Sequence, residues 1–462
     1  MSDSLTKLNR DQLIFTMSLL SNVSANDIES DSATLKTNAV NNLNAYLKTL
    51  STALPADLSI VWGPFTANSA LQSDSSLYNT DNMMFVAKAA DPKYDGNMYI
   101  VAVAGTNPSS NFAWFNEDFM VNKVVPYGTN GYVSLGATTG VTKHQGMYGT
   151  TSNGTVPILS AFLKSQTTSN DRIIVTGHSL GGALAPLMAI TLKDALQKAN
   201  ANRTFECHTY AGPSTGDSTF MNYMIGRMDT FQAINNTLDI VPLAWQSDNL
   251  KEIPGLYEKS DCKKSDPMKN NCITNCDGKY GIGFDFIVNG VIKWALNQST
   301  VTSSQGKVIQ YAAPDPTHTS TFIGGDDLQN HFIMYKGVPV SICTALPAMA
   351  LDIINTDGDI YKDLNTIWQD EIPDNQKTSD KLGVDDLTRF LSFLAIAGKQ
   401  HIGCYIDEIL PSDVIDHVKD VIGPSNNPDA AKQEGDYNLL QLLNKVVSYL
   451  NPPAQIQPPN IG

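Results

Sequence analysis

Hydrophobic positions in the middle of the chain alternate between short β-branched runs and stretches with helical spacing. Residues 173–175 form a compact apolar run, which is typical of a parallel strand buried on both faces. The apolar residues that follow recur with the period of a helix: Ala183, Leu184, Leu187, Met188, Ile190, Leu192, Ala195 and Leu196. Further runs predict strands at 83–87, 98–104, 205–211 and 231–234, and a helix around 156–164. Elements of these two kinds indicate an α/β protein.

The two ends of the chain are predicted to be helical. Amphipathic stretches near the N-terminus indicate a helical segment over 1–60 that packs on the main domain. The main domain itself is expected over 61–340, with an insertion at 246–330. The remainder, 341–462, is predicted as a mainly helical C-terminal extension.

The charge of the chain limits the kinds of molecule that it is expected to bind. The 462 residues carry a net charge of −15 at pH 7, and Lys and Arg form no cluster. This argues against nucleic acid and against an anionic membrane surface, so any contact with lipid would be apolar. No apolar run approaches the ~20 residues of a membrane span. The N-terminus lacks the pattern of a cleaved secretory signal, which leaves the cytoplasm or export by another route open.

The six cysteines fall into two kinds of surroundings. Cys207 lies in a strand-like apolar run and is predicted to be a buried thiol. Cys262, Cys272 and Cys276 lie together in a polar loop, where one disulfide would fit. Their spacing lacks paired C-x-x-C arms, so we expect no metal site.

The pentapeptide at 177–181, Gly-His-Ser-Leu-Gly, lies where the predicted strand meets the predicted helix. Strand, glycine turn and helix are the context of a nucleophile elbow, whereas an isolated motif of this kind is an ordinary surface turn. The flanking glycines have no Cβ, so Ser179 can occupy a strained turn that exposes its hydroxyl. The backbone N–H of Leu180, at the helix N-terminus, would face a developing oxyanion. Ser179 is therefore predicted to be a nucleophile.

Two further candidates follow predicted strands, at the edge of the sheet where functional groups gather. Thr106 comes just after the strand 98–104 and could donate a second N–H to the oxyanion. Asp239 comes just after the strand 231–234, in the order Ser, Asp, His of a hydrolase triad. A carboxylate there would orient an imidazole and stabilise the imidazolium.

The segment after Thr106 places aromatic side chains beside polar ones. Phe112, Trp114 and Phe115 belong to this short amphipathic stretch. Two interpretations stay open: a helix of the core, or a lid over 107–121 whose apolar face covers the site in water and opens at a lipid surface.

Several pieces of the chain together resemble the class 3 lipases, which include secreted lipases of filamentous fungi and bacterial relatives. The matching pieces occur in family order: Ala104-Gly105-Thr106, the aromatic segment, Lys143 to Met147, Gly177 to Ala183, Thr209 to Pro213 and Asp239 to Pro242. The resemblance implies an α/β-hydrolase fold, with a mostly parallel central sheet flanked by helices. It also implies ester hydrolysis, Thr106 and Leu180 as oxyanion donors, and a mobile lid at 107–121. Residues 1–50 and those after Gly337 have no matched counterpart.

Four histidines follow Asp239 in the sequence and are candidates for the base. His318 lies in a Pro/Thr loop and His417 on an exposed acidic stretch, which leaves His401 and His331. Both begin a His-x-x-x-Tyr pattern. The surroundings of His401 resemble the C-terminal signature of the bacterial branch, and we predict that it is the base. His331, the runner-up, lies nearer to Asp239 in sequence.

These residues predict a serine ester hydrolase that acts on lipid esters at an oil–water or membrane interface, most simply a triacylglycerol lipase. Phospholipase A1 or lysophospholipase activity shares the same chemistry. A lipase-like binding protein without catalysis, or a lipid carrier with an aromatic docking patch, is the non-enzymatic alternative. No cofactor is expected, and the sequence does not specify an oligomeric state.

Overall fold

The computed structural model describes residues 4–24, 28–70, 76–105, 120–151, 154–197, 203–257, 299–324, 332–335, 338–356 and 381–418, with isolated positions at 288–297 and 358–369. The chain divides into two compact units. The first comprises Met1–Asn249, Gln298–Phe322 and Tyr405–Lys419, and the second Leu250–Asn297, Ile323–Cys404 and Asp420–Gly462. The division at 60 and 340 stays a prediction, as does the insertion at 246–330.

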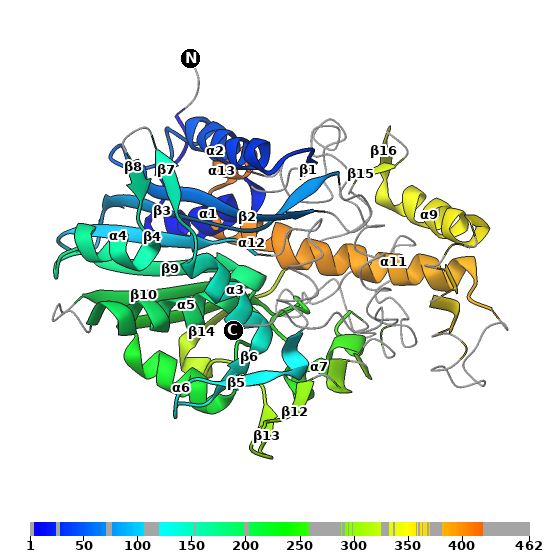
Figure 1. Cartoon of the computed structure of the whole chain (residues 1–462). Helices are drawn as coiled ribbons and strands as arrows, with labels where there is room; N and C mark the ends of the chain where they lie inside the picture. The colour runs from blue at the N-terminus through cyan, green and yellow to red at the C-terminus, as the bar shows by residue number, and fades with distance from the viewer. Residues whose placement is uncertain are drawn as a thin grey trace, which may run out of the picture. The chain divides into compact units, whose positions relative to one another are not determined.

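An eight-stranded sheet organises the first unit (Figure 1). Its order is β1-β3-β4-β9-β10-β11-β14, and β2 pairs with β3. The strands are β1 (Ile28–Glu29), β2 (Ser59–Ala70), β3 (Tyr78–Ala90), β4 (Asn97–Val103), β9 (Arg172–His178), β10 (Thr204–Tyr210), β11 (Thr230–Asn236) and β14 (Thr319–Phe322). Neighbours from β4 to β14 are parallel, while β1, β2 and β4 pair antiparallel with β3. The predicted, mostly parallel sheet is confirmed.

Four of the described helices cover one face of this sheet and bury the side chains that point from the strands toward that face. They are α3 (Leu135–Gln145), α4 (Leu159–Gln166), α5 (Leu180–Gln197) and α6 (Ser218–Arg227). Val101, Val175 and Cys207 point into this core because side chains alternate along a strand. Burial raises the pKa of the Cys207 thiol, as expected for the buried cysteine predicted from the sequence.

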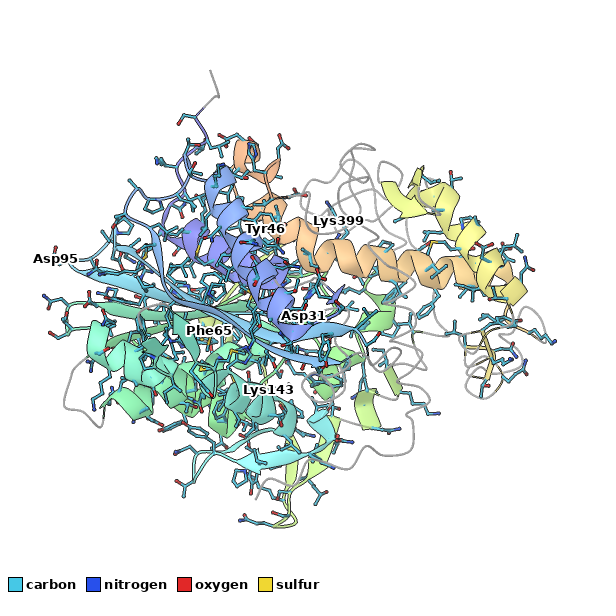
Figure 2. The ribbon with its side chains drawn as sticks, turned by 45° about the horizontal axis from the view of Figure 1, so that its top comes forward. Asp31, Tyr46, Phe65, Asp95, Lys143 and Lys399 are labelled. Atoms are coloured by element: carbon cyan, nitrogen blue, oxygen red, sulfur yellow. The ribbon has the colours of Figure 1, made fainter. Side chains whose placement is uncertain are left out.

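The helix α1 (Arg10–Val23) lies against the opposite face of the sheet. Residues 13–21 of this helix are at most 2% exposed. A helix buried all round must be covered on both sides. Its outer side meets α2 (Ser32–Thr49), which Asp31 caps at its N-terminus (Figure 2). The helix α1 also contacts a C-terminal segment of the chain, because Gln12 Nε2 donates to the main-chain oxygen of Ile409 at 2.9 Å. The predicted N-terminal helices are confirmed.

A buried network of charges ties α1 to the edge where the parallel strands begin. Arg10 donates to Asp91 at 3.2 Å and to Glu206 at 2.9 Å, and Arg172 lies 3.5 Å from Glu206. Burial alone would raise the pKa of Glu206, but hydrogen bonds from His208 and Arg10 outweigh it and hold that pKa at about 2. The start of α1 is thereby attached to the starts of β9 and β10.

Short elements complete the first unit. The hairpins pair β5 (Val124–Pro126) with β6 (Tyr132–Ser134), β7 (Gly149–Thr151) with β8 (Gly154–Val156), and β12 (Thr300–Thr302) with β13 (Val308–Gln310). Single turns of helix are η2 (Met120–Asn122), α7 (Ser247–Leu250), η5 (Pro316–His318) and α13 (Ser412–Ile415).

The second unit is mainly helical where it is described. Its helices α9 (Ile342–Thr356) and α11 (Val384–Gly398) pack together, and α11 continues into the π-helical turn η8 (Lys399–Gly403) and then α12 (Cys404–Ile409). It also contains η3 (Ile253–Gly255) and the hairpin of β15 (Phe332–Tyr335) and β16 (Val338–Ser341). Cys343 is disulfide-bonded, whereas Cys207 and Cys404 are buried thiols. No helix in the described part of the chain is long and apolar enough to cross a membrane.

Three strands of the sheet were not predicted from the hydrophobic pattern. β1 has only two residues, which is too few for any pattern. β2 contains Gly63 at φ +77° and Pro64, and its pairing with β3 shifts register at three places. Such irregularities destroy the alternation by which a strand is recognised. β14 is a four-residue polar edge strand, which is too short to show any alternation.

Candidate active site

Ser179 occupies the sharp turn between β9 and α5. Its φ is +60°, a left-handed conformation that a residue with a side chain rarely adopts. The surrounding structure holds it there: the Ser179 N–H donates to Tyr210 O at 3.0 Å, and Ser179 O accepts from Ala183 N–H at 3.1 Å. The side chain is half-buried. The turn therefore has the strained geometry that the sequence predicted.

Close packing explains the glycines around this turn. A Cβ on Gly177 would lie 2.3 Å from the Gly181 backbone, and a Cβ on Gly181 would lie 2.3 Å from Val103 O. A Cβ on Gly182 would lie 2.9 Å from Gly212 Cα. These contacts are closer than real Cβ atoms allow, so β4, β9 and α5 can approach one another at the turn only without side chains.

The turn also lies beside the end of β4. A Cβ on Gly105 would lie 2.6 Å from His178 O and 3.3 Å from Ser179 Cβ. Leu180 is the first residue of α5 and is buried. The first amides of a helix have no partner within the helix. Thr106 and the lid residues Phe112, Trp114 and Phe115 lie outside the described residues, and their roles stay predictions.

Asp239 follows β11 at the same edge of the sheet, as predicted from its place after a strand. Its main chain is held in a tight turn, because the Asp239 N–H donates to Asn236 O at 3.0 Å. The side chain is 1% exposed. Its Oδ1 accepts from the Val241 N–H at 2.9 Å, and its Oδ2 accepts from the Tyr405 hydroxyl at 3.0 Å. A buried carboxylate needs such donors, because desolvation otherwise penalises its charge.

Tyr405 connects three parts of this site and was assigned no role from the sequence. Its side chain is fully buried, and its hydroxyl accepts from the Asn236 N–H at 2.8 Å while donating to Asp239. Its ring meets the ring of His178 edge to face at 5.6 Å and that of Phe322 at 4.9 Å. The His-x-x-x-Tyr pattern was visible in the sequence, but it occurs twice and indicates no partner for the tyrosine.

The histidines have distinct surroundings. His401, the predicted base, is half-buried in η8 and belongs to the second unit, and the runner-up His331 lies outside the described residues. His417 is exposed, and His318 packs its ring against Phe231 at 6.3 Å. His178 is 2% exposed within the elbow. The choice of His401 over His331 stays a prediction.

His144, in the Lys-His-Gln-Gly-Met stretch, is completely buried in α3. Burial lowers the pKa of His144 to about 4, which makes the ring neutral at pH 7, and its Nδ1 lies 2.8 Å from Gly140 O. Its neighbour Lys143, labelled in Figure 2, reaches Asp81 at 3.0 Å. No cluster of three or more His, Cys, Asp or Glu side chains in the described ranges is arranged to hold a metal ion.

Comparisons with known proteins find a family match over part of the chain. Residues 100–248 match the family model described as lipase (class 3). A lipase from Rhizomucor miehei is 31% identical over 112 residues, which is 20% of this chain and 31% of the relative. This chain therefore matches only about a third of that relative's length. The crystal structure of M37 lipase superposes with a TM-score of 0.51 at 23% identity, covering 69% of this chain and 86% of that chain. The predicted resemblance to class 3 lipases is confirmed over residues 100–248, and the predicted α/β-hydrolase fold is confirmed.

Proposed function

We propose that this chain, whose residues 100–248 belong to the class 3 lipase family, is a serine hydrolase of lipid esters, and specifically a triacylglycerol lipase. The observation that carries the proposal is the left-handed Ser179 between β9 and α5. A strained serine at a strand–helix turn has a cost in stability and no use in a passive scaffold. Asp239, at the end of β11, supplies a buried carboxylate at the same edge of the sheet.

Each residue has a defined role in the proposed reaction. Ser179 Oγ attacks the acyl carbon of the ester, while His401 accepts the hydroxyl proton. The alkoxy leaving group takes this proton as the bond to the acyl carbon breaks, which leaves an acyl-enzyme on Ser179. Water, deprotonated by the same imidazole, then releases the fatty acid and restores the serine. Asp239 orients the imidazole and stabilises its charged form.

The developing oxyanion would be held by backbone N–H groups of Leu180 and Thr106. Removing one donor of this kind costs enzymes about 10²–10³ in kcat, so the geometry of these amides contributes substantially to the rate. Leu180 is the first residue of α5, where the partial positive charge of the helix N-terminus also favours an anion.

The preference for lipid esters is inferred from the sequence of the proposed lid. Phe112, Trp114 and Phe115 follow Thr106 directly, and the net charge of −15 favours apolar over electrostatic contact with an interface. We therefore expect activity to depend on the physical state of the substrate.

Hydrolysis of a triglyceride measured across its solubility limit tests this substrate class. We expect the rate to rise steeply once an emulsion forms, because an apolar surface would stabilise the open lid. A short soluble ester, whose concentration never reaches saturation, is the matched control and should show simple saturation. Simple saturation of the rate with increasing concentration of both substrates would contradict the lid hypothesis. Faster hydrolysis of phospholipid than of triglyceride at equal interfacial area would replace the lipase proposal by phospholipase A1 activity.

Tyr405→Phe tests the buried hydroxyl that supports Asp239. The variant removes the charge-assisted hydrogen bond to Asp239 and also the acceptor of the Asn236 N–H, so we expect kcat to fall by roughly tenfold with KM little changed. Without this donor the carboxylate stabilises the imidazolium more strongly, and the acid limb of the pH profile of kcat/KM should move to higher pH. Steady-state kinetics between pH 5 and 9 would measure both effects.

Tyr127→Phe is the matched control, because the Tyr127 hydroxyl also donates to a carboxylate, that of Asp194 at 2.9 Å. Asp194 lies on α5 away from the strand ends, so this variant should keep the wild-type pH profile. If both variants shift the profile equally, Tyr405 has no specific role at Asp239.

A further inference from the structure

The helix α1 runs along the sheet from the edge where the parallel strands begin to the edge where they end. Arg10, its first residue, binds Asp91 and Glu206 at the first edge, and Asn22, in its last turn, contacts Gly105 at the second. A helix of 14 residues is about 21 Å long, close to the length of a seven-residue strand. Both ends of α1 are thus attached to the sheet, and its middle is fully buried.

Asn22 accepts a hydrogen bond from the first backbone amide beyond the β-ladder. The pairing of β4 with β9 ends at Val103, and the Ala104 N–H donates to Met83 O at 3.0 Å. The next amide, that of the buried Gly105, donates to the side-chain oxygen of Asn22. A buried N–H without a partner is costly, so this side chain completes the end of the strand.

Gly105 fills a narrow space between Asn22 and the nucleophile. A Cβ on Gly105 would lie 3.3 Å from both Asn22 Oδ1 and Ser179 Cβ, and 2.6 Å from His178 O. The peptide of Gly105 therefore cannot tilt without moving against the elbow or losing its bond to Asn22. Fixing this peptide also limits the directions in which the chain can continue to Thr106.

We infer that Asn22 is a positioning residue for the proposed active site: its side chain holds the end of β4 against Ser179. The inference rests on the proposed hydrolase function. It assigns a task to the N-terminal helix, which lies outside the matched residues 100–248. Asn22 acts through the main chain of Gly105 and touches no reacting atom.

Two variants of Asn22 separate this role from simple packing. Asn22→Leu keeps the size of the side chain but has no acceptor, while Asn22→Asp keeps an oxygen at the same place. We expect Asn22→Leu to lower kcat tenfold or more with KM within about twofold, because a misplaced oxyanion donor weakens the transition state more than the ground state. Asn22→Asp should recover part of that loss.

Ser21→Ala is the matched control. Ser21 is the preceding residue of α1, is fully buried, and its hydroxyl donates to Ser18 O at 2.7 Å within the helix. This variant should keep wild-type kcat. Equal losses of kcat in Ser21→Ala and Asn22→Leu would show that only the packing of α1 matters, and equal losses in the two Asn22 variants would exclude the role of the acceptor.

Hydrogen exchange of the Gly105 amide gives a readout that needs no enzyme activity. We expect the amide to be protected in wild type and Asn22→Asp and to exchange at least tenfold faster in Asn22→Leu. Unchanged exchange in Asn22→Leu would overturn the inference. If wild type hydrolysed no ester but exchange followed this pattern, the hydrolase proposal would fail while the contact itself would stand.

Discussion

Ser179→Ala should reduce ester hydrolysis by at least ~10³-fold while the protein folds normally. The reason is chemical: the acyl group needs a nucleophile, and alanine offers none, so only transition-state binding by the rest of the site would remain. Folding should be unaffected or improved, because the strained φ of +60° suits alanine no worse than serine and no buried bond of the Ser179 main chain is lost. Initial rates on a soluble ester, with thermal unfolding measured in parallel, would test this.

A fluorophosphonate probe provides a second measurement on the same variant. It should label wild type at one serine and leave Ser179→Ala unlabelled. Ser165→Ala is the matched control, because the hydroxyl of the exposed Ser165 bonds only within α4, donating to Phe162 O at 2.8 Å and accepting from Gln166 Nε2 at 3.4 Å. This variant should be labelled and active as wild type. A folded wild-type protein that neither reacts with the probe nor hydrolyses esters would favour the non-catalytic binding protein.

His401→Ala and His331→Ala should differ sharply, and we expect only His401→Ala to approach the loss seen for Ser179→Ala. Without a base the serine hydroxyl stays protonated, and the loss of a triad member costs on the order of 10³–10⁶ in kcat. The effect should be specific to one histidine, because in the proposed triad Asp239 orients a single imidazole. Steady-state kinetics of both variants on the soluble ester would identify the base.

His417→Ala is the control for the loss of an exposed histidine that has no role in the proposed triad, and this variant should keep wild-type activity. A large loss in His331→Ala together with near-normal rates in His401→Ala would reverse the assignment of the base. It would leave the roles of Ser179 and Asp239 intact.

The hydrogen bond between Tyr405 and Asp239 connects a C-terminal segment of the chain to the first unit, which contains the eight-stranded sheet. Residues 405–418 belong to this unit although the second unit precedes them in sequence. The hydroxyl of Tyr405 reaches a residue 166 positions earlier and binds both the carboxylate of Asp239 and the amide of Asn236. The Val241 N–H that also binds Asp239 lies within the family match at 100–248, whereas the side-chain donor Tyr405 comes from outside it.

Much of the local architecture was predictable because its causes lie close together in the sequence. The elbow is encoded in residues 177–182, where the glycines that must approach other backbone are interleaved with the strained serine. The central strands are recognisable because parallel strands buried on both faces need continuous apolar runs. The position of Asp239 followed from the strand before it, since the carboxyl ends of parallel strands share one edge.

The contacts that support these residues were decided only by the tertiary structure. Asn22 meets Gly105 across 83 positions, and Tyr405 meets Asp239 across 166. A hydrophobic pattern indicates which residues are buried, but it does not indicate which distant segment covers them. Polar partners of this kind are chosen when α1 and the C-terminal segment pack on the sheet, because only then does a buried amide or carboxylate lose water and require a particular neighbour. The sequence by itself thus determined the strained turn at Ser179 and the class of chemistry proposed for it, and packing determined what holds that turn in place.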